Sequence, residues 1–96
     1  MIYHITTTAD WENRRPGLDF FPRDYSREGF IHCCTREQLE GVLDRYFKGQ
    51  SNLVLLHLDE SKLHAELRYE PSTHSELFPH LYGGINQDAI IKIETR

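Results

Sequence analysis

The apolar run Leu53-Val54-Leu55-Leu56-His57-Leu58 places the strongest constraint on what this chain can fold into. Six residues is the length of a strand, and a strand without polar alternation has to be covered on both faces. Asp59-Glu60-Ser61 follows and ends the run. We therefore predict a central strand over 53–58 with a layer of structure on each side. Its single imidazole, His57, is expected to be held by a backbone carbonyl.

The chain of 96 residues is expected to form a single domain, residues 1–96, around one core. At this length a folded protein buries only about 60 to 65% of the surface that its unfolded chain exposes. Hydrophobic residues make up 39% of the chain, which is enough for a packed interior without metal or disulfide cross-links.

Cys33 and Cys34 are adjacent, and the eight-membered ring of a disulfide between them would strain the intervening peptide bond. We therefore expect a reducing, cytoplasmic location. Neighbouring residues of a strand face opposite ways, so one of the two thiols is expected in the core.

Charge and hydropathy limit the partners of this protein. A net charge of minus four, from 11 basic and 15 acidic residues, leaves no basic stripe to neutralise a phosphate backbone, so nucleic acid is not expected as a partner. No run of eighteen apolar residues occurs, and Ile2 to Ile5 is typical of a strand and not of a secretion signal. We expect a soluble protein that is neither exported nor inserted into a membrane, and its oligomeric state stays open.

The other elements are predicted from spacing and punctuation. Residues 2–5 form a first strand, and Thr6-Thr7-Thr8 offers N-caps for a short helix whose Trp11 packs in the core. Residues 15–28 have no sustained period and are predicted to be a loop. The segment Gly29-Phe30-Ile31-His32-Cys33 is predicted to be a buried strand.

A helix is predicted next, because Thr35-Arg36-Glu37-Gln38 is a capping box and apolar residues follow at helical spacing as far as Phe47, before Gly49 ends the helix. Three further strands are predicted over 67–70, 78–82 and 89–93. These elements predict an α+β fold, with a small mixed or split β-sheet of about five to six strands and two main helices.

Two histidines are candidates for a functional cleft. His32 alternates with Ile31 and Cys33, so its imidazole should face away from the core if those two side chains are buried. His80 and Tyr82 share one facing at period two, and an imidazole beside a phenol can clamp a planar ring.

Glu70 closes a strand before Pro71, a position suited to electrostatic work. Arg68 is expected to pair with Glu66 or Glu70, and a plain surface salt bridge explains such a pair equally well. The six histidines show no close pairs such as His-x-x-x-His, so no metal is expected. His64 and His74 lie in polar connections and are expected to be solvated.

Six parts of the chain form an ordered set: Ile2-Tyr3-His4-Ile5, Trp11, Glu28-Gly29-Phe30-Ile31-His32-Cys33, Leu53 to Leu56, Tyr69-Glu70 and Phe78-Pro79-His80-Leu81-Tyr82. This set closely resembles the bacterial family catalogued as domain of unknown function 952, over nearly the whole chain. That family in turn resembles a small, divergent ADP-ribosyltransferase fold, a split-sheet domain that holds NAD in a cleft.

The resemblance implies roles for particular residues. It implies an enzyme that binds NAD or a related ADP-ribose compound and cleaves or transfers at the nicotinamide ribose, in a cleft lined by His4, His32, His80 and Tyr82. His32, His80 and Glu70 are the catalytic candidates. The candidates for cofactor binding are His4, Gly29, Phe30, Arg68 and Tyr82.

Two other functions are open at this stage. One is a non-catalytic module that binds a nucleotide or another small metabolite, because the Glu that stabilises the ribose cation in ADP-ribosyltransferases has no unambiguous counterpart here. The other is a 2'-phosphotransferase activity of the kind that acts on RNA, which also runs on this fold, although the acidic net charge argues against an RNA substrate.

Overall fold

The computed structural model describes residues 1–72 and 75–96. The described strands are β1 (Ile2–Thr7), β2 (Ile31–His32), β3 (Cys34–Thr35), β4 (Leu53–Leu58), β5 (Glu66–Pro71), β6 (Leu77–Tyr82) and β7 (Ile90–Thr95). The described helices are α1 (Thr8–Glu12), α2 (Tyr25–Glu28), α3 (Arg36–Tyr46) and the short 3-10 helices η1 (Glu60–Lys62) and η3 (Gln87–Ala89). None of these helices is long and apolar enough to cross a membrane.

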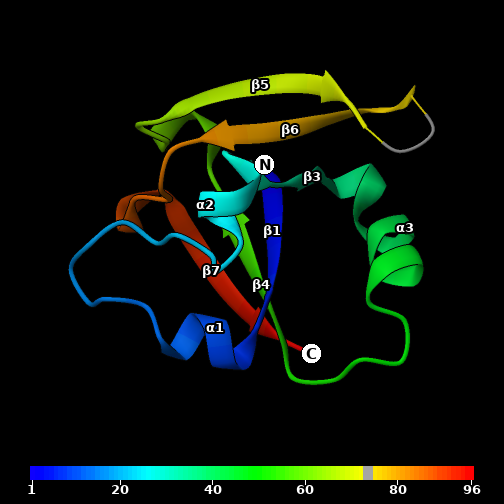
Figure 1. The fold of residues 1–96 in the computed structure, drawn as a ribbon, viewed down its shortest axis with the longest axis horizontal. Coiled ribbons are helices and arrows are strands. Elements are labelled where there is room, and N and C mark those ends of the chain that lie inside the picture. The colour runs from blue at the N-terminus through cyan, green and yellow to red at the C-terminus, as the bar shows by residue number, and fades with distance from the viewer. Residues whose placement is uncertain (73–74) are drawn as a thin grey trace.

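The strands form two sheets (Figure 1), one of four strands in the order β3-β1-β4-β7 and one of three in the order β2-β6-β5. The predicted α+β class and the split sheet are confirmed. The alternative of a mixed sheet is wrong, because every described strand pair is antiparallel. There are seven described strands instead of five or six, because the predicted second strand is divided between the two sheets.

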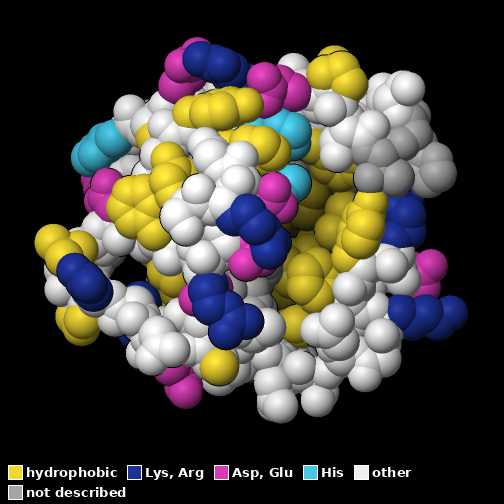
Figure 2. All heavy atoms as spheres, viewed as in Figure 1, with side chains coloured by type: hydrophobic (Ala, Val, Ile, Leu, Met, Phe, Trp, Pro, Cys, Tyr) yellow, Lys and Arg dark blue, Asp and Glu magenta, His cyan; other side chains and the backbone are white. Residues whose placement is uncertain are grey.

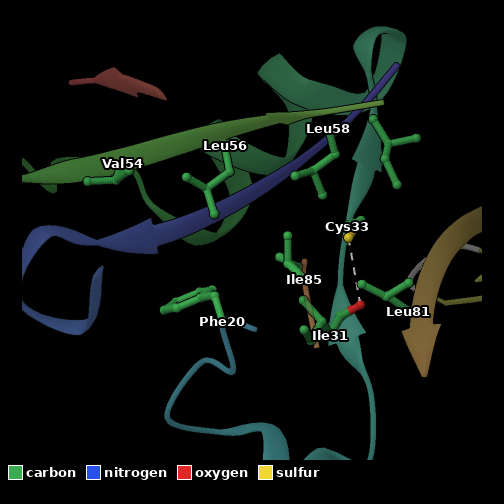
Figure 3. Close-up of a cluster of buried hydrophobic side chains, with 9 residues drawn as sticks. Phe20, Ile31, Cys33, Val54, Leu56, Leu58, Leu81 and Ile85 are labelled. Carbon is green, nitrogen blue, oxygen red and sulfur yellow. Dashed lines mark hydrogen bonds between the residues drawn. The ribbon is translucent and has the colours of Figure 1, made fainter. Parts of the chain in front are cut away.

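β4 is covered on both faces, as its apolar run predicted. One face packs in a cluster with the three-stranded sheet (Figure 3), through Val54, Leu56 and Leu58. The other face contributes Leu55 to a second cluster, which includes Leu39 of α3. The domain therefore has a layer of sheet on one side of its central strand and a helix on the other.

The structure corrects the prediction that the His57 imidazole is bound by a backbone carbonyl. Its Nε2 atom lies 3.0 Å from Oε1 of Glu94 on β7, a carboxylate and not a backbone carbonyl. The cause is register, because Lys92 is the direct partner of His57 on β7, so Glu94 lies diagonally opposite on the same face. Tyr3 packs edge-on against the imidazole, with the ring centres 4.7 Å apart.

The segment 31–35 changes sheets, which corrects the single strand predicted over residues 29–33. Ile31 and His32 pair with β6, whereas Cys34 and Thr35 pair with β1. The N–H of Cys33, between them, donates to the carbonyl of Pro79 at 3.0 Å. The two sheets therefore diverge at this short segment.

Both cysteines are buried and unpaired, whereas only one was expected in the core. They do face opposite ways, Cys33 into the cluster between the sheets and Cys34 into the cluster beneath α3. Both faces of the segment are covered where it changes sheets, so both thiols are enclosed.

The capping signals in the sequence correctly predicted the starts of α1 and α3. Thr7 caps α1 by accepting from the N–H of Asp10, and the capping box of Thr35 and Gln38 is present at the start of α3. The loop predicted over residues 15–28 is wrong in part, because it contains α2 and because Phe20 pairs with Ile85 in an isolated bridge. A helix of four residues is too short to show a period in the sequence.

Replacing Gly83 with alanine should destabilise the fold by about 1–3 kcal/mol. Gly83 has φ 150°, and a Cβ there would lie 2.5 Å from Cβ of Ala65. The matched control is Gly41→Ala in α3, where the new methyl meets only the Arg45 side chain, at 3.4 Å, and where alanine should add about 0.5–1 kcal/mol. Urea unfolding measures both, and an unchanged midpoint for Gly83→Ala would contradict the prediction.

Candidate functional site

A cavity of about 490 Å³ lies where the two sheets diverge. Figure 2 shows a hollow on this face with a largely hydrophobic floor and histidine at its upper rim. Its walls come from β1, α2, the segment 30–34 and α3. Its lining includes His4, Asp10, Phe30, His32 and Cys34. This volume is enough for a small organic ligand.

The register of β1 shows which backbone groups face this cavity. The N–H of Thr8 donates to the carbonyl of Asn52 at 2.8 Å, so the even-numbered residues of β1 direct their backbone groups to β4. The odd-numbered residues direct theirs the other way, where β3 pairs no further than Tyr3. Ile5 and Thr7 line the cavity, and their peptide groups lie on an edge of β1 that no described strand covers.

His4 presents a buried hydrogen-bond acceptor at the cavity wall. Its side chain is only 6% exposed, and Nδ1 lies 2.7 Å from the carbonyl oxygen of His32. Burial lowers the pKa of His4 to about 4, so the imidazole is neutral at pH 7. Because Nδ1 donates to a carbonyl, Nε2 carries the free lone pair, and it has no hydrogen-bond partner among residues 1–72 and 75–96.

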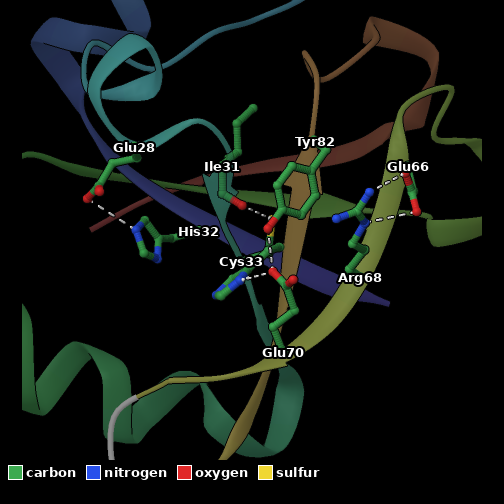
Figure 4. Close-up of polar contacts among 9 residues, drawn as sticks. Glu28, Ile31, His32, Cys33, Glu66, Arg68, Glu70 and Tyr82 are labelled. Carbon is green, nitrogen blue, oxygen red and sulfur yellow. Dashed lines mark hydrogen bonds and ion pairs between the residues drawn. The ribbon is translucent and has the colours of Figure 1, made fainter.

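A second polar group lies on the three-stranded sheet, on the face opposite its core side chains (Figure 4). One carboxylate oxygen of Glu70 accepts hydrogen bonds from the Tyr82 hydroxyl and from Nδ1 of His80, the latter at 2.8 Å. The hydrogen bond from Tyr82 is the largest cause that lowers the pKa of Glu70 below its ordinary value, and the bond from His80 is the next. The same bond raises the pKa of Tyr82. Glu70 is therefore an ionised carboxylate that fixes the two side chains beside it.

His32 and His80, nearly fifty residues apart in the chain, are brought together here. They are direct cross-strand partners on β2 and β6, and their ring centres lie 5.5 Å apart. His32 is exposed between buried Ile31 and Cys33, as its alternation predicted. Its Nε2 lies 3.3 Å from Glu28 Oε1.

The predicted site residues form two neighbouring groups and not one cleft wall. His4, Phe30 and His32 line the cavity, whereas Glu70, His80 and Tyr82 lie outside its lining. Phe30 joins the groups, because its ring stacks on His80 with the centres 4.1 Å apart. The structure therefore places Phe30 between the cavity and the His80–Glu70 pair.

Arg68 and Gly29 lie at the edge of this arrangement. Arg68 pairs with Glu66 at 2.9 Å, and its guanidinium lies 4.5 Å above the Tyr82 ring. Both members of that ion pair are at least half exposed, as expected of a surface salt bridge. Gly29 ends α2 in the left-handed conformation, with φ 81°, and so sets the direction in which Phe30 leaves the helix.

Two residues of the cavity lining, Asp10 and Glu28, were not predicted as site residues from the sequence. Asp10 accepts from the Thr6 hydroxyl at 3.2 Å and from the Arg23 N–H at 3.0 Å, which ties the loop to β1 beside the cavity. Glu28, which holds His32, is the other. Asp10 stands three residues after the N-cap Thr7, a spacing that signals the start of a helix. That spacing gives no indication that Asp10 lines a cavity.

Neither cysteine is suited to nucleophilic chemistry, and residues 1–72 and 75–96 show no evident metal site. Cys34 lines the cavity, but burial raises the pKa of its thiol to about 12, so it is protonated at neutral pH. Burial also raises the pKa of Cys33. Within the described residues, no group of three or more His, Cys, Asp or Glu side chains could hold a metal ion.

The fold and site together define a small α+β domain with a ligand-sized cavity between two diverging antiparallel sheets. The family model described as protein of unknown function (DUF952) matches residues 5–93. The chain therefore belongs to this family. None of the curated proteins compared with the chain matches it.

Solved structures of one bacterial protein share the fold. The crystal structure of CC0527 from Caulobacter crescentus superposes with a TM-score of 0.86 at 30% identity, covering 98% of this chain and 83% of that one. A crystal structure of a methionine double mutant of CC0527 gives a TM-score of 0.85 at 29% identity, with the same coverage. The solution NMR structure gives 0.81 at 30% identity, covering 98% and 82%.

Proposed function

We propose that this protein binds NAD or a related ADP-ribose compound in the cavity, with His4 holding a ribose hydroxyl. The observation that carries the proposal is Nε2 of His4, a neutral, buried acceptor at the cavity wall without a partner among the described residues. A buried acceptor left unpaired costs free energy that a ligand hydroxyl would recover. The split-sheet layout and the resemblance to the ADP-ribosyltransferase fold support a nucleotide as the source of that hydroxyl.

The uncovered edge of β1 supports the nicotinamide end of such a ligand. A carboxamide carries an N–H donor and a carbonyl acceptor side by side, and the peptide groups of Ile5 and Thr7 offer the complementary pair along the cavity. Tyr3, Tyr25 and Phe30 supply apolar wall for a planar ring.

An enzyme acting at the nicotinamide ribose would use Glu70 electrostatically. Positive charge develops on the ribose ring as the glycosidic bond breaks, and an ionised carboxylate nearby lowers that barrier. Glu70 is kept ionised by its two hydrogen bonds, and His80 and Tyr82 hold it in place. In this proposal Glu70 and His80 act on the ribose, while His32 orients it.

A non-catalytic binding module is the second candidate, and one observation favours it. Glu70 lies outside the cavity lining, and one of its oxygens already accepts from His80 and Tyr82. Saturable binding of NAD without nicotinamide release would support this candidate. Nicotinamide release that is lost in Glu70→Gln would support the enzyme.

Exchanging His4 for asparagine should weaken NAD and ADP-ribose binding about tenfold, the size of one buried hydrogen bond. The asparagine amide N–H stands where Nδ1 stood and keeps a donor for the carbonyl of His32, but asparagine has no acceptor at the position of Nε2. Amide NMR titration measures the affinity, with exposed His64→Asn as the matched control. Absence of shifts around residues 29–34 at millimolar NAD and ADP-ribose would refute the proposed function.

A further inference from the structure

We propose that two copies of this chain associate through the outer edge of β7, the edge that does not pair with β4. The two β7 strands run antiparallel about a two-fold axis, with Ile93 of one copy directly opposite Ile93 of the other. The two four-stranded sheets then form one continuous sheet of eight strands. The lining of the cavity includes no residue of β7, so this association goes beyond the proposed function and does not depend on it.

The outer edge of β7 carries unpaired backbone groups. β7 is the last strand of its sheet (Figure 1). Leu53 and Arg96 exchange both of their backbone hydrogen bonds at 2.8 Å, so the even-numbered residues of β7 direct their peptide groups to β4. Ile93 and Thr95 direct theirs the other way, where no described strand pairs with them. Such a row of donors and acceptors is a ready template for another strand.

The edge also exposes apolar surface that a second copy would cover. Ile93 is 50% exposed, although it lies opposite Leu56, whose side chain is completely buried between the two sheets. Cross-strand partners share a face, so Ile93 continues the core face of β4 to a position that the three-stranded sheet does not cover. A two-fold axis at Ile93 brings the two isoleucine side chains directly opposite one another, where each removes apolar surface of the other from water.

The charges beside Ile93 select this partner and this register. Lys92 and Glu94 lie together on the other face of β7, so pairing about Ile93 sets each Lys92 opposite Glu94 of the second copy, twice by symmetry. Pairing about residue 92 or 94 would instead set like charges opposite one another. Glu94 already accepts from His57 and Arg96, which lowers its pKa and keeps it ionised. Lys92 has no ion pair with any other described residue.

The same charges explain why the occupant is a second copy and not an unrelated strand. A lysine on an edge strand normally opposes strand addition, because it meets no counter-charge there. An identical antiparallel strand supplies that counter-charge, and self-complementarity of this kind is what a two-fold interface requires. The register shift of β7 against β4 falls between Lys92 and Ile90, so residues 92–95 stay regular.

The association is expected to be weak. One pair of short strands buries less than the roughly 1,200 Å² at which stable interfaces begin, so it belongs with transient contacts. We expect a dissociation constant on the order of 100 μM. The protein is then a monomer when dilute and a dimer when concentrated, and the cavity stays open in both.

Sedimentation equilibrium and amide hydrogen exchange of the full chain, from micromolar to millimolar concentration, test this association. We expect the mass to rise from monomer to dimer, and the Ile93 and Thr95 amides to exchange more slowly as it does. The amides of Ile5 and Thr7 lie on the uncovered edge of β1 and should exchange at the same rate throughout. A monomer at every concentration, or a dimer without protection of Ile93 and Thr95, would overturn the proposal.

Charge exchange tests the register. Lys92→Glu sets carboxylates opposite one another at both pairs and should weaken the dimer about tenfold, whereas the double variant Lys92→Glu with Glu94→Lys restores both pairs and should restore association. Lys48→Glu is the matched control, because Lys48 is exposed in a different part of the chain and its exchange changes the net charge equally. Equal dimerisation of Lys92→Glu and Lys48→Glu, or no recovery in a folded double variant, would refute this pairing. If the double variant does not fold, the exchange of Ile93 and Thr95 in the wild type decides.

Discussion

Between pH 6.5 and pH 4 the protein is expected to lose about 3 kcal/mol of stability through His4 alone. Burial lowers the pKa of His4 from 6.5 to about 4 in the folded chain. Each pKa unit corresponds to about 1.36 kcal/mol, so this difference is worth about 3 kcal/mol. The unfolded chain takes up its proton near pH 6.5, and the folded chain only near pH 4. The stabilisation is therefore complete above pH 6.5 and is lost as the pH falls toward 4.

The loss should be measured as a difference between two proteins. Hydrogen-bonded carboxylates such as Glu70, Glu94 and Asp59 have lowered pKa values, and their contributions begin to fall where the unfolded chain protonates, near pH 4.5 for Glu and 3.8 for Asp, which overlaps the lower end of this range. Urea unfolding at pH 7, 6, 5 and 4 gives the total for the wild type. His4→Asn keeps the donor to the His32 carbonyl but cannot titrate, so subtracting its curve isolates His4.

The matched control is His64→Asn, because His64 is an exposed histidine. Its curve should parallel that of the wild type. A curve for His4→Asn as steep as the wild-type curve between pH 6.5 and 4 would show that His4 is not held neutral in the folded state. The acceptor proposed for the ligand would then be lost as well, because a protonated Nε2 donates and does not accept.

Local signals explain which parts of the fold could be predicted. The run of residues 53–58 specified a strand covered on two faces, and the capping box specified the start of α3, because each of these is set by residues next to one another. The division of residues 31–35 between two sheets depends on partners almost fifty residues away, Pro79 and Leu81. No local pattern encodes such a partner, so the segment looked like one strand.

The same distinction applies to the candidate site. Alternation correctly predicted that His32 faces away from the core, and period two correctly placed His80 and Tyr82 on one face. The position of Phe30 over His80 was not predictable, because it depends on the left-handed turn at Gly29 and on the packing of α2. The sequence could thus indicate which side chains gather, but not which of them covers another.

Ile31→Ala is expected to cost about 2–5 kcal/mol of stability, the largest effect of a single change proposed for this protein. Ile31 is completely buried, and its side chain packs between the sheets with Cys33, Leu81 and Ile85. Removing three carbons there leaves a cavity beside β2, a strand of only two residues. The matched change Ile31→Val removes one methyl group and should cost only about 0.5–1.5 kcal/mol.

The two variants also connect the core to the candidate site, because Ile31 and His32 are neighbours that face opposite ways. If Ile31 makes the main contact that holds β2 against β6, truncating its side chain should loosen the pairing of His32 with His80. Urea unfolding gives the stability, and hydrogen exchange of the β2 amides in the folded state gives the local opening. We expect faster exchange in Ile31→Ala than in Ile31→Val, beyond what their stabilities account for. Equal stability of the two variants would show that the contact between the sheets does not depend on this side chain.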